Sequence, residues 1–189
     1  MNKTKIARWV SIAGHPFVMM VLLVLLLSWA MEPAGALRIT GFVVVMGLIP
    51  TGWLVWRGGV SRRTQTAAAG RSSGRPMLYL SLLVVLLLSG VYFHFVEQAE
   101  LLARGSVVTA LMVAVAALAN RWLTLSLHLA FAVYSGLILA SIHLGEGLPI
   151  LIITPLLAWS RLVLLRHTLA EVIGGSVLGF SAALLFIVL

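Results

Sequence analysis

The sequence predicts an all-α integral membrane protein, a helical bundle of six or seven transmembrane helices. Three observations support this prediction. Hydrophobic residues make up 61% of the 189 residues, and only 10% are charged. The apolar residues form successive runs, most of them close to the length that crosses about 30 Å of hydrocarbon. The basic residues collect between these runs, at the expected membrane edges. We therefore expect residues 1–189 to form a single transmembrane domain.

The expected helices follow the apolar runs in order along the chain. Pro16 lies near the start of the first helix, Pro50 favours a kink in the second, and Pro155 falls inside the sixth. The basic residues before the first run and the Ala34-Gly35-Ala36 sequence after it resemble a signal peptide, but we expect the segment to be retained as a helix. The seven expected helices are 12–31, 38–57, 77–96, 103–120, 122–143, 148–164 and 168–189.

Each expected connection carries a turn or polar signal between two apolar runs. The longest connection, 58–76, holds four arginines and no acidic residue. The last helix begins near Thr168 and contains Gly175 and Gly179, which form a small-residue face for helix packing. The other connections are a Pro-Gly turn at 31–35, an acidic link at 97–100, the Asn120-Arg121 turn and a loop at 143–148.

The basic residues lie almost entirely on one side of this topology. With seven crossings, the N-terminus, the 58–76 connection and the turns near 121 and 164 share a face. All Lys and Arg residues except Arg38 and Arg104 belong to that face, eleven of thirteen. The positive-inside rule then predicts that this face is cytoplasmic. Because the basic residues are scattered at membrane edges, the net charge of +8 does not indicate a nucleic-acid partner.

The most informative polar cluster lies between Ser160 and Gly175. His167 and Glu171 are four residues apart, so a helix places them on one face. A carboxylate that accepts a hydrogen bond from one imidazole nitrogen fixes the tautomer and leaves the other nitrogen available as base, nucleophile or ligand. Arg161 adds a guanidinium whose geometry matches phosphate or carboxylate oxygens. These residue types together suggest an anion site with a nucleophile.

A purely structural interpretation of the same residues is also open. Thr168 and Glu171 have the spacing of a capping box, which commonly starts a helix. Arg161 and Arg166 also fit the role of interfacial anchors. The alternating topology favours a site, because it brings three separate segments to one membrane face. These segments are 71–76, 126–128 and 160–171.

At this point the chain resembles the type 2 phosphatidic acid phosphatase superfamily of membrane lipid phosphatases, which has three sequence motifs. The third is Ser-Arg, five residues, His, three residues, Asp. Ser160, Arg161, His167 and Glu171 keep every spacing, with Glu in place of Asp. The resemblance covers about residues 58–180.

The other two motifs of the family are matched in part. The second is Pro-Ser-Gly-His, of which Ser126 and His128 are present. The first is Lys, six residues, Arg-Pro, and its Arg-Pro corresponds to Arg75-Pro76. Ala68 stands at its Lys position, and Arg71 or Arg63 is available to supply the charge instead.

The resemblance implies a role for each of these residues. His167 attacks phosphorus to form a phosphohistidine, Glu171 orients it, and His128 protonates the leaving alcohol and then activates water. The remaining site residues bind the phosphoryl oxygens: Arg75, Arg161, Arg71, Ser126 and Ser160. The substrate is a lipid phosphate or an isoprenoid (prenyl) diphosphate, and neither a metal nor another cofactor is required. Such roles agree with phosphoryl transfer, which depends on positioning and charge stabilisation.

Other functions remain open from the sequence. A bis-histidine haem carrier is one, since His128 and His167 start helices at one face while His94 and His143 end helices at the other. A small anion transporter and a non-catalytic protein that binds anionic lipid head groups are two more. The expected location is a bacterial inner membrane with the site on the cytoplasmic face. A periplasmic site is the alternative, because bacterial members of the family often have that orientation. The oligomeric state is left open.

Overall fold

This computed structural model describes residues 2–64 and 75–189, without the side chains at 49–51, 53–64, 75–76 and 78. Within these residues the protein contains eight helices and no strand. This confirms the all-helical prediction. The helices are α1 Lys3–Ala13, α2 Pro16–Met31, α3 Pro33–Thr64, α4 Arg75–Phe95, α5 Glu100–Ala119, α6 Leu127–Ile142, α7 Leu144–Val163 and α8 Leu169–Val188.

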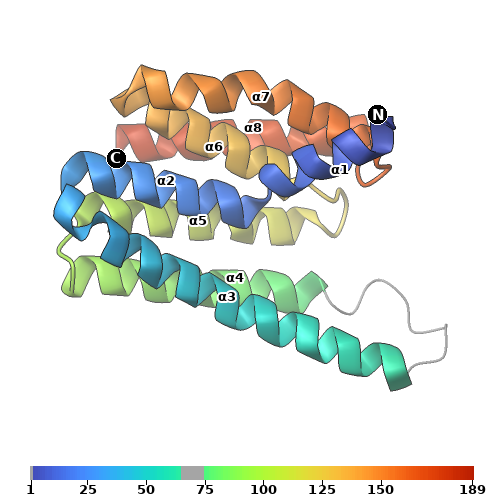
Figure 1. Cartoon of the computed structure of the whole chain (residues 1–189), viewed down its shortest axis with the longest axis horizontal. Helices are drawn as coiled ribbons and strands as arrows, with labels where there is room; N and C mark the ends of the chain where they lie inside the picture. The colour runs from blue at the N-terminus through green and yellow to red at the C-terminus, as the bar shows by residue number, and fades with distance from the viewer. Residues whose placement is uncertain (1, 65–74) are drawn as a thin grey trace.

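Helix α6 is the centre of the bundle. It packs against α7, α8 and α2, and it is buried on nearly every side (Figure 1). Helix α5 packs against α8 of this group and against α4 on its other side. Helix α3 lies along α2 and α4. A helix that is apolar all round is expected at such a central position. The elements that carry His128 and Glu171 are therefore the central helix and one of its closest neighbours.

Two glycines of α8 allow this close approach. A Cβ atom added at Gly175 would lie 2.4 Å from the carbonyl oxygen of Ser126. One added at Gly179 would lie 2.2 Å from the carbonyl oxygen of Ala130. Both distances are shorter than side-chain atoms tolerate, so only glycine fits at either position. The predicted small-residue face is confirmed, and it sets the spacing between α6 and α8.

The connections alternate between the two ends of the bundle. The N-terminus, the α5–α6 connection and the α7–α8 connection lie at one end, while the α2–α3, α4–α5 and α6–α7 connections lie at the other (Figure 1). We call the first of these the histidine end, because it contains His15, His128 and His167. The alternation brings the 126–128 and 160–171 segments to one end, as the sequence predicts.

Several of these helices are suited to a membrane. Among the described residues, α5, α7 and α8 are long and apolar enough to span one. Helices α1 and α2 together add a fourth candidate, which is bent by 44° at its break. The membrane character predicted from the composition is therefore present. The apolar part of α3, most of α4 and the whole of α6 are shorter, at 10–17 residues each.

The first expected helix is wrong in its start and in its continuity. The sequence predicts one helix over 12–31, whereas the structure begins α1 at Lys3 and interrupts the helix at Gly14 and His15. Pro16 is the first residue of α2, where its missing N–H costs no hydrogen bond. A Cβ atom at Gly14 would lie 2.4 Å from the side chain of Leu157. The break thus places the chain directly against α7.

The second expected helix and the 58–76 connection also need correction. Helix α3 begins at Pro33, continues past Pro50 and ends at Thr64, so it includes residues that the sequence assigns to the connection. The remainder of that connection up to residue 74 lies outside the described residues. Residues 77–96 and 168–189 were predicted as helices and correspond to α4 and α8 within two residues.

The central helix α6 starts later than predicted, whereas α5 and α7 start earlier. The sequence predicts a helix from 122, but residues 123–126 are not helical and α6 begins at Leu127. The reason is a tertiary hydrogen bond, since the Ser126 N–H donates to the Glu171 carbonyl at 3.0 Å. Helix α5 begins at 100 rather than 103. The expected 143–148 loop is reduced to His143 between α6 and α7.

Candidate active site

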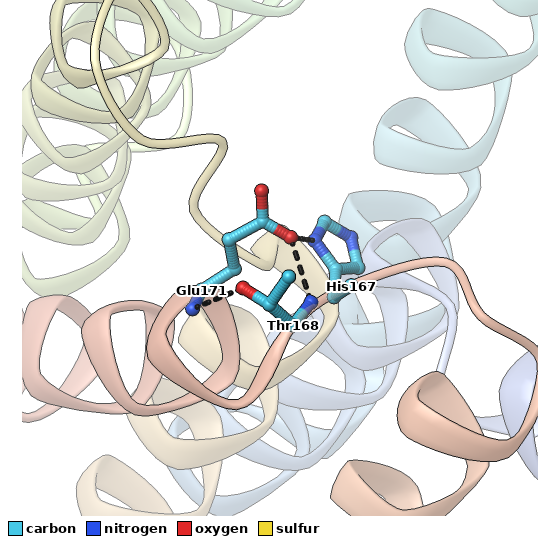
Figure 2. Close-up of polar contacts among 3 residues, drawn as sticks. All are labelled: His167, Thr168 and Glu171. Carbon is cyan, nitrogen blue, oxygen red and sulfur yellow. Dashed lines mark hydrogen bonds and ion pairs between the residues drawn. The ribbon is translucent and has the colours of Figure 1, made fainter.

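The start of α8 holds His167 and Glu171 together. Glu171 Oε2 lies 3.1 Å from His167 Nδ1 and accepts a hydrogen bond of 2.9 Å from the Thr168 N–H (Figure 2). The Thr168 hydroxyl accepts from the Glu171 N–H at 3.4 Å, which completes a capping box. The predicted cap and the predicted His–Glu pair are therefore both present, and one carboxylate oxygen serves both.

This pair is sheltered from solvent. The side chain of His167 is 11% exposed and that of Glu171 is 17% exposed. Burial is the largest cause that lowers the pKa of His167 below 6.5, and the nearby Arg161 lowers it further. Glu171 and the backbone of Thr124 act in the opposite direction without reversing the shift. His167 is consequently neutral at pH 7, which is the form that a nucleophile requires.

Arg161 reaches the same region from the end of α7. Its Nη1 donates a hydrogen bond of 2.7 Å to the hydroxyl of Ser11 in α1. Its Nε atom is buried without a hydrogen-bond partner, and no carboxylate of the described residues forms an ion pair with it. A half-buried guanidinium without a counter-charge is expensive in a membrane protein. An anion at this position would supply the missing partner.

His128 lies at the start of α6, between these groups. Arg161 and His167 both act on it electrostatically, and the backbone of Ser11 forms a hydrogen bond with its ring. The ring of His15 meets that of His128 edge to face, with 5.4 Å between the ring centroids. The structure thus brings His128, His167 and Arg161 together, as the motifs suggest.

His15 is a neighbour that the sequence did not identify. The sequence offers a weak signal for it, since a histidine directly before a proline near a helix start can be an N-cap. Its position beside His128 depends on the break between α1 and α2, which apolar periodicity did not reveal. His94 and His143 belong to the opposite end, where His94 pairs with Glu100 at 2.9 Å and His143 precedes α7.

The two predicted serines differ in what they can offer a ligand. Ser126 is fully buried, and its hydroxyl has no hydrogen-bond partner. Ser160 is equally buried, but its hydroxyl donates to the Leu157 carbonyl of its own helix at 2.7 Å. Ser126 therefore retains an unused polar atom beside the His–Glu pair, whereas Ser160 is satisfied within α7.

The side chains of the first-motif arginines, Arg75 and Arg71, lie outside the described part of the chain. Arg75 is the first residue of α4, at the histidine end, but its side chain is outside the described part. Helix α4 packs mainly on α5 (Figure 1). Arg71 lies outside the described residues altogether. Their predicted phosphate-binding role stays a prediction.

Two further features bear on ligand binding. A cavity of about 40 Å³ lies between α2, α4 and α5, with α3, α6 and α8 also contributing to its walls. Its lining is mainly apolar, with Thr109 and Tyr134 among it, and no candidate site residue borders it. In the chain outside residues 1 and 65–74, no three His, Asp or Glu side chains converge to hold a metal.

Comparison of the chain with protein-family models, curated proteins and solved structures finds no match.

Proposed function

We propose that this protein is a membrane-embedded phosphatase of the type 2 phosphatidic acid phosphatase superfamily that hydrolyses a lipid phosphate or a prenyl diphosphate. The observation that carries the proposal is the hydrogen bond of Ser126 to Glu171, which joins two motif segments that are 45 residues apart in the chain. It places His128 beside Arg161 and His167. These are the residues to which the sequence resemblance assigns the chemistry.

In the first half of the proposed reaction, the free nitrogen of His167 attacks phosphorus while Glu171 accepts the Nδ1 hydrogen bond. The phosphorus–oxygen bond to the lipid breaks, and His128, which enters this step as an imidazolium, donates a proton to the departing alcohol oxygen and becomes neutral. Arg161 stabilises the charge on the equatorial phosphoryl oxygens. In the second half, His128 takes a proton from water as the water oxygen attacks the phosphohistidine. Phosphate leaves, and both histidines return to their starting states.

The surroundings of the histidines favour a lipid substrate. Leu165 is 91% exposed in the α7–α8 connection, and Trp122 is 77% exposed in the α5–α6 connection. Both connections lie at the histidine end of the bundle (Figure 1). Exposed apolar side chains at this depth are typical of a membrane interface. A lipid phosphate can reach such a site from the membrane plane, with its head group against Arg161.

We also propose how the chain lies in the membrane. The α1–α2 pair and each of α3 to α8 make one crossing, which gives the seven crossings predicted from the sequence. The shorter helices are accommodated by tilting of their neighbours or by local thinning of the bilayer. The membrane is a bacterial inner membrane, with the histidine end on the cytoplasmic side and the periplasmic side as the alternative.

The test is phosphate release by purified protein from four substrates: phosphatidic acid, phosphatidylglycerol phosphate, undecaprenyl diphosphate and farnesyl diphosphate. We expect the wild type to release phosphate from at least one of them and His167→Ala to release none. His143→Ala is the matched control, because it removes a histidine from the opposite end. Activity that survives in His167→Ala, or a wild type inactive on the whole panel, would overturn the proposal.

A further inference from the structure

The break between α1 and α2 leaves a main-chain carbonyl unused. In an uninterrupted helix, the carbonyl of Ser11 would accept from the N–H of residue 15. Here the His15 N–H instead bonds to Ile12 at 3.1 Å, and the Gly14 N–H bonds to Val10 at 2.9 Å. The end of α1 therefore leaves the Ser11 carbonyl without a partner from its own helix.

His128 forms its hydrogen bond with the backbone of Ser11. One nitrogen of the His128 ring is thereby engaged, and the other is left to exchange a proton with a ligand. The hydroxyl of the same serine accepts from Arg161. Ser11 thus contacts two predicted site residues, although it belongs to a segment outside the sequence resemblance.

The imidazole of His15 is fixed by its own helix. Its Nδ1 accepts a hydrogen bond of 3.3 Å from the Phe17 N–H, so this side chain is the N-cap of α2. An accepting Nδ1 leaves the proton of the neutral ring on Nε2 and restricts rotation of the ring. The restricted ring lies edge to face against His128, at a centroid separation of 5.4 Å. Edge-to-face contacts of this kind favour one relative orientation of two rings.

We propose that His15 is a positioning residue for His128, and that the α1–α2 break holds the His128 ring in the orientation that protonates the leaving alcohol. Ser11 fixes one edge of that ring and His15 fixes its rotation. His15 itself stays exposed at the histidine end, so it can be replaced without opening the core. This inference rests on the proposed phosphatase function.

Two substitutions separate the ring contact from the helix cap. His15→Asn retains a good N-cap residue and removes the ring. His15→Phe retains a ring against His128 and removes the cap. We expect His15→Asn to lower kcat and His15→Phe to stay closer to the wild type. A role in capping alone predicts the reverse order.

The leaving group provides the decisive readout. An alkyl phosphate needs a proton on its departing oxygen, whereas a nitrophenyl phosphate with the same apolar tail does not. General acid catalysis contributes about 10²–10⁴-fold. We expect His15→Asn to lower kcat/KM on the alkyl phosphate by about tenfold or more and to change kcat/KM on the nitrophenyl phosphate by less than about twofold, because kcat/KM reports the step in which the leaving group departs. An equal loss on both substrates, or no loss on either, would overturn the inference.

A second measurement is independent of turnover. Protein labelled with ¹⁵N in its histidines is compared as wild type and His15→Asn, with the His128 signals assigned through His128→Asn. We expect two well-separated ring nitrogen signals for His128 in the wild type and signals that move together in His15→Asn. Unchanged His128 signals would refute the positioning role. If the wild type proves inactive on every phosphate, the proposed function fails, while this measurement still decides whether His15 orients His128.

Discussion

At the residue scale, the central feature is that Glu171 has two roles in the same structure. Its Oε2 receives both the Thr168 N–H and His167 Nδ1. A helix cap accounts for the first contact, and the proposed function accounts for the second, in which Glu171 orients His167 as the nucleophile. The extra methylene that distinguishes Glu from the Asp of the family motif is compatible with this double contact. The two roles can be separated because they depend on different properties of the side chain.

The first prediction separates these roles with Glu171→Gln and Thr168→Ala. Glutamine keeps the capping box but removes the charge that stabilises His167 during attack. We expect it to lower kcat by about 10²-fold or more with little loss of stability. Thr168→Ala removes the cap and should lower the free energy of unfolding by about 1 kcal/mol while activity remains. Phosphate release and thermal unfolding measure the two effects. If both variants lose stability and neither loses activity, Glu171 is only a cap.

The second prediction concerns pH and His167. Because burial and Arg161 lower its pKa below 6.5, the ring is neutral at pH 7 and becomes protonated only in more acidic solution. We expect kcat/KM to fall as the pH decreases below about 6.5, because protonation removes the nucleophilic lone pair of His167. The same shift makes the unfolded chain bind a proton more readily, so stability also falls as the pH decreases from about 6.5. An acidic limb of the rate profile centred above pH 6.5 would contradict the assignment.

The sequence was most informative where the contacts are local. The spacing of His167 and Glu171 predicted their contact, although His167 precedes the N-cap Thr168, so the capping box and not a shared helix face brings the two side chains together. Alternation of the helices predicted that Ser126 and Glu171 share an end, although their hydrogen bond required the structure. His15 was missed because its place depends on how Gly14 packs against Leu157. Arg75 and Arg71 are still predictions, since their side chains lie outside the described part.

At the element scale, the geometry of the site depends on how closely α8 approaches α6. Gly175 lies against the backbone of Ser126, and Ser126 is bonded to Glu171 one turn earlier in α8. Apolar periodicity could not set the start of α6, because residues 123–126 are as compatible with a helix as those that follow. The contact with α8 decides that α6 starts at Leu127.

The third prediction tests this approach with Gly175→Ala. The new methyl group would lie 2.4 Å from the Ser126 carbonyl oxygen, so α8 must move away. Overpacking of this kind costs about 1–3 kcal/mol, and we expect a similar loss in the free energy of unfolding. Activity should fall as well, because the movement separates Glu171 from Ser126.

Gly41→Ala is the matched control for this prediction. Gly41 lies within α3, and a Cβ atom there has nothing within 4 Å. Replacing an uncrowded helical glycine with alanine should stabilise the protein by about 0.5–1 kcal/mol. If Gly175→Ala is as stable and active as Gly41→Ala, the close approach of α8 to α6 does not determine the site.

At the scale of the whole molecule, the distribution of charge predicts an orientation. Helix α1, which carries Lys3, Lys5 and Arg8, lies at the histidine end (Figure 1). Arg161 in the last turn of α7 and Arg121 and Arg166 in the two connections belong to the same end. Arg38 and Arg104 lie in the first two turns of α3 and α5, at the opposite end. A site that binds phosphate also recruits arginines, so part of this bias belongs to the chemistry and not to topology. Arg161 has this role in the proposed function, whereas the basic residues of α1 are exposed and fit the positive-inside rule directly.

The fourth prediction decides the orientation by single-cysteine labelling, which is direct because the chain contains no cysteine. Gly145→Cys and Leu165→Cys place exposed thiols at opposite ends of α7, one of the helices long enough to span a membrane. A cytoplasmic histidine end predicts that an impermeant maleimide labels Gly145→Cys in intact spheroplasts and labels Leu165→Cys only after lysis. The reverse pattern would place the site outside, and the arginines at this end would then be explained by phosphate binding alone. Labelling of both thiols in intact spheroplasts would show that α7 does not cross the membrane, which would also remove the proposed seven-crossing topology.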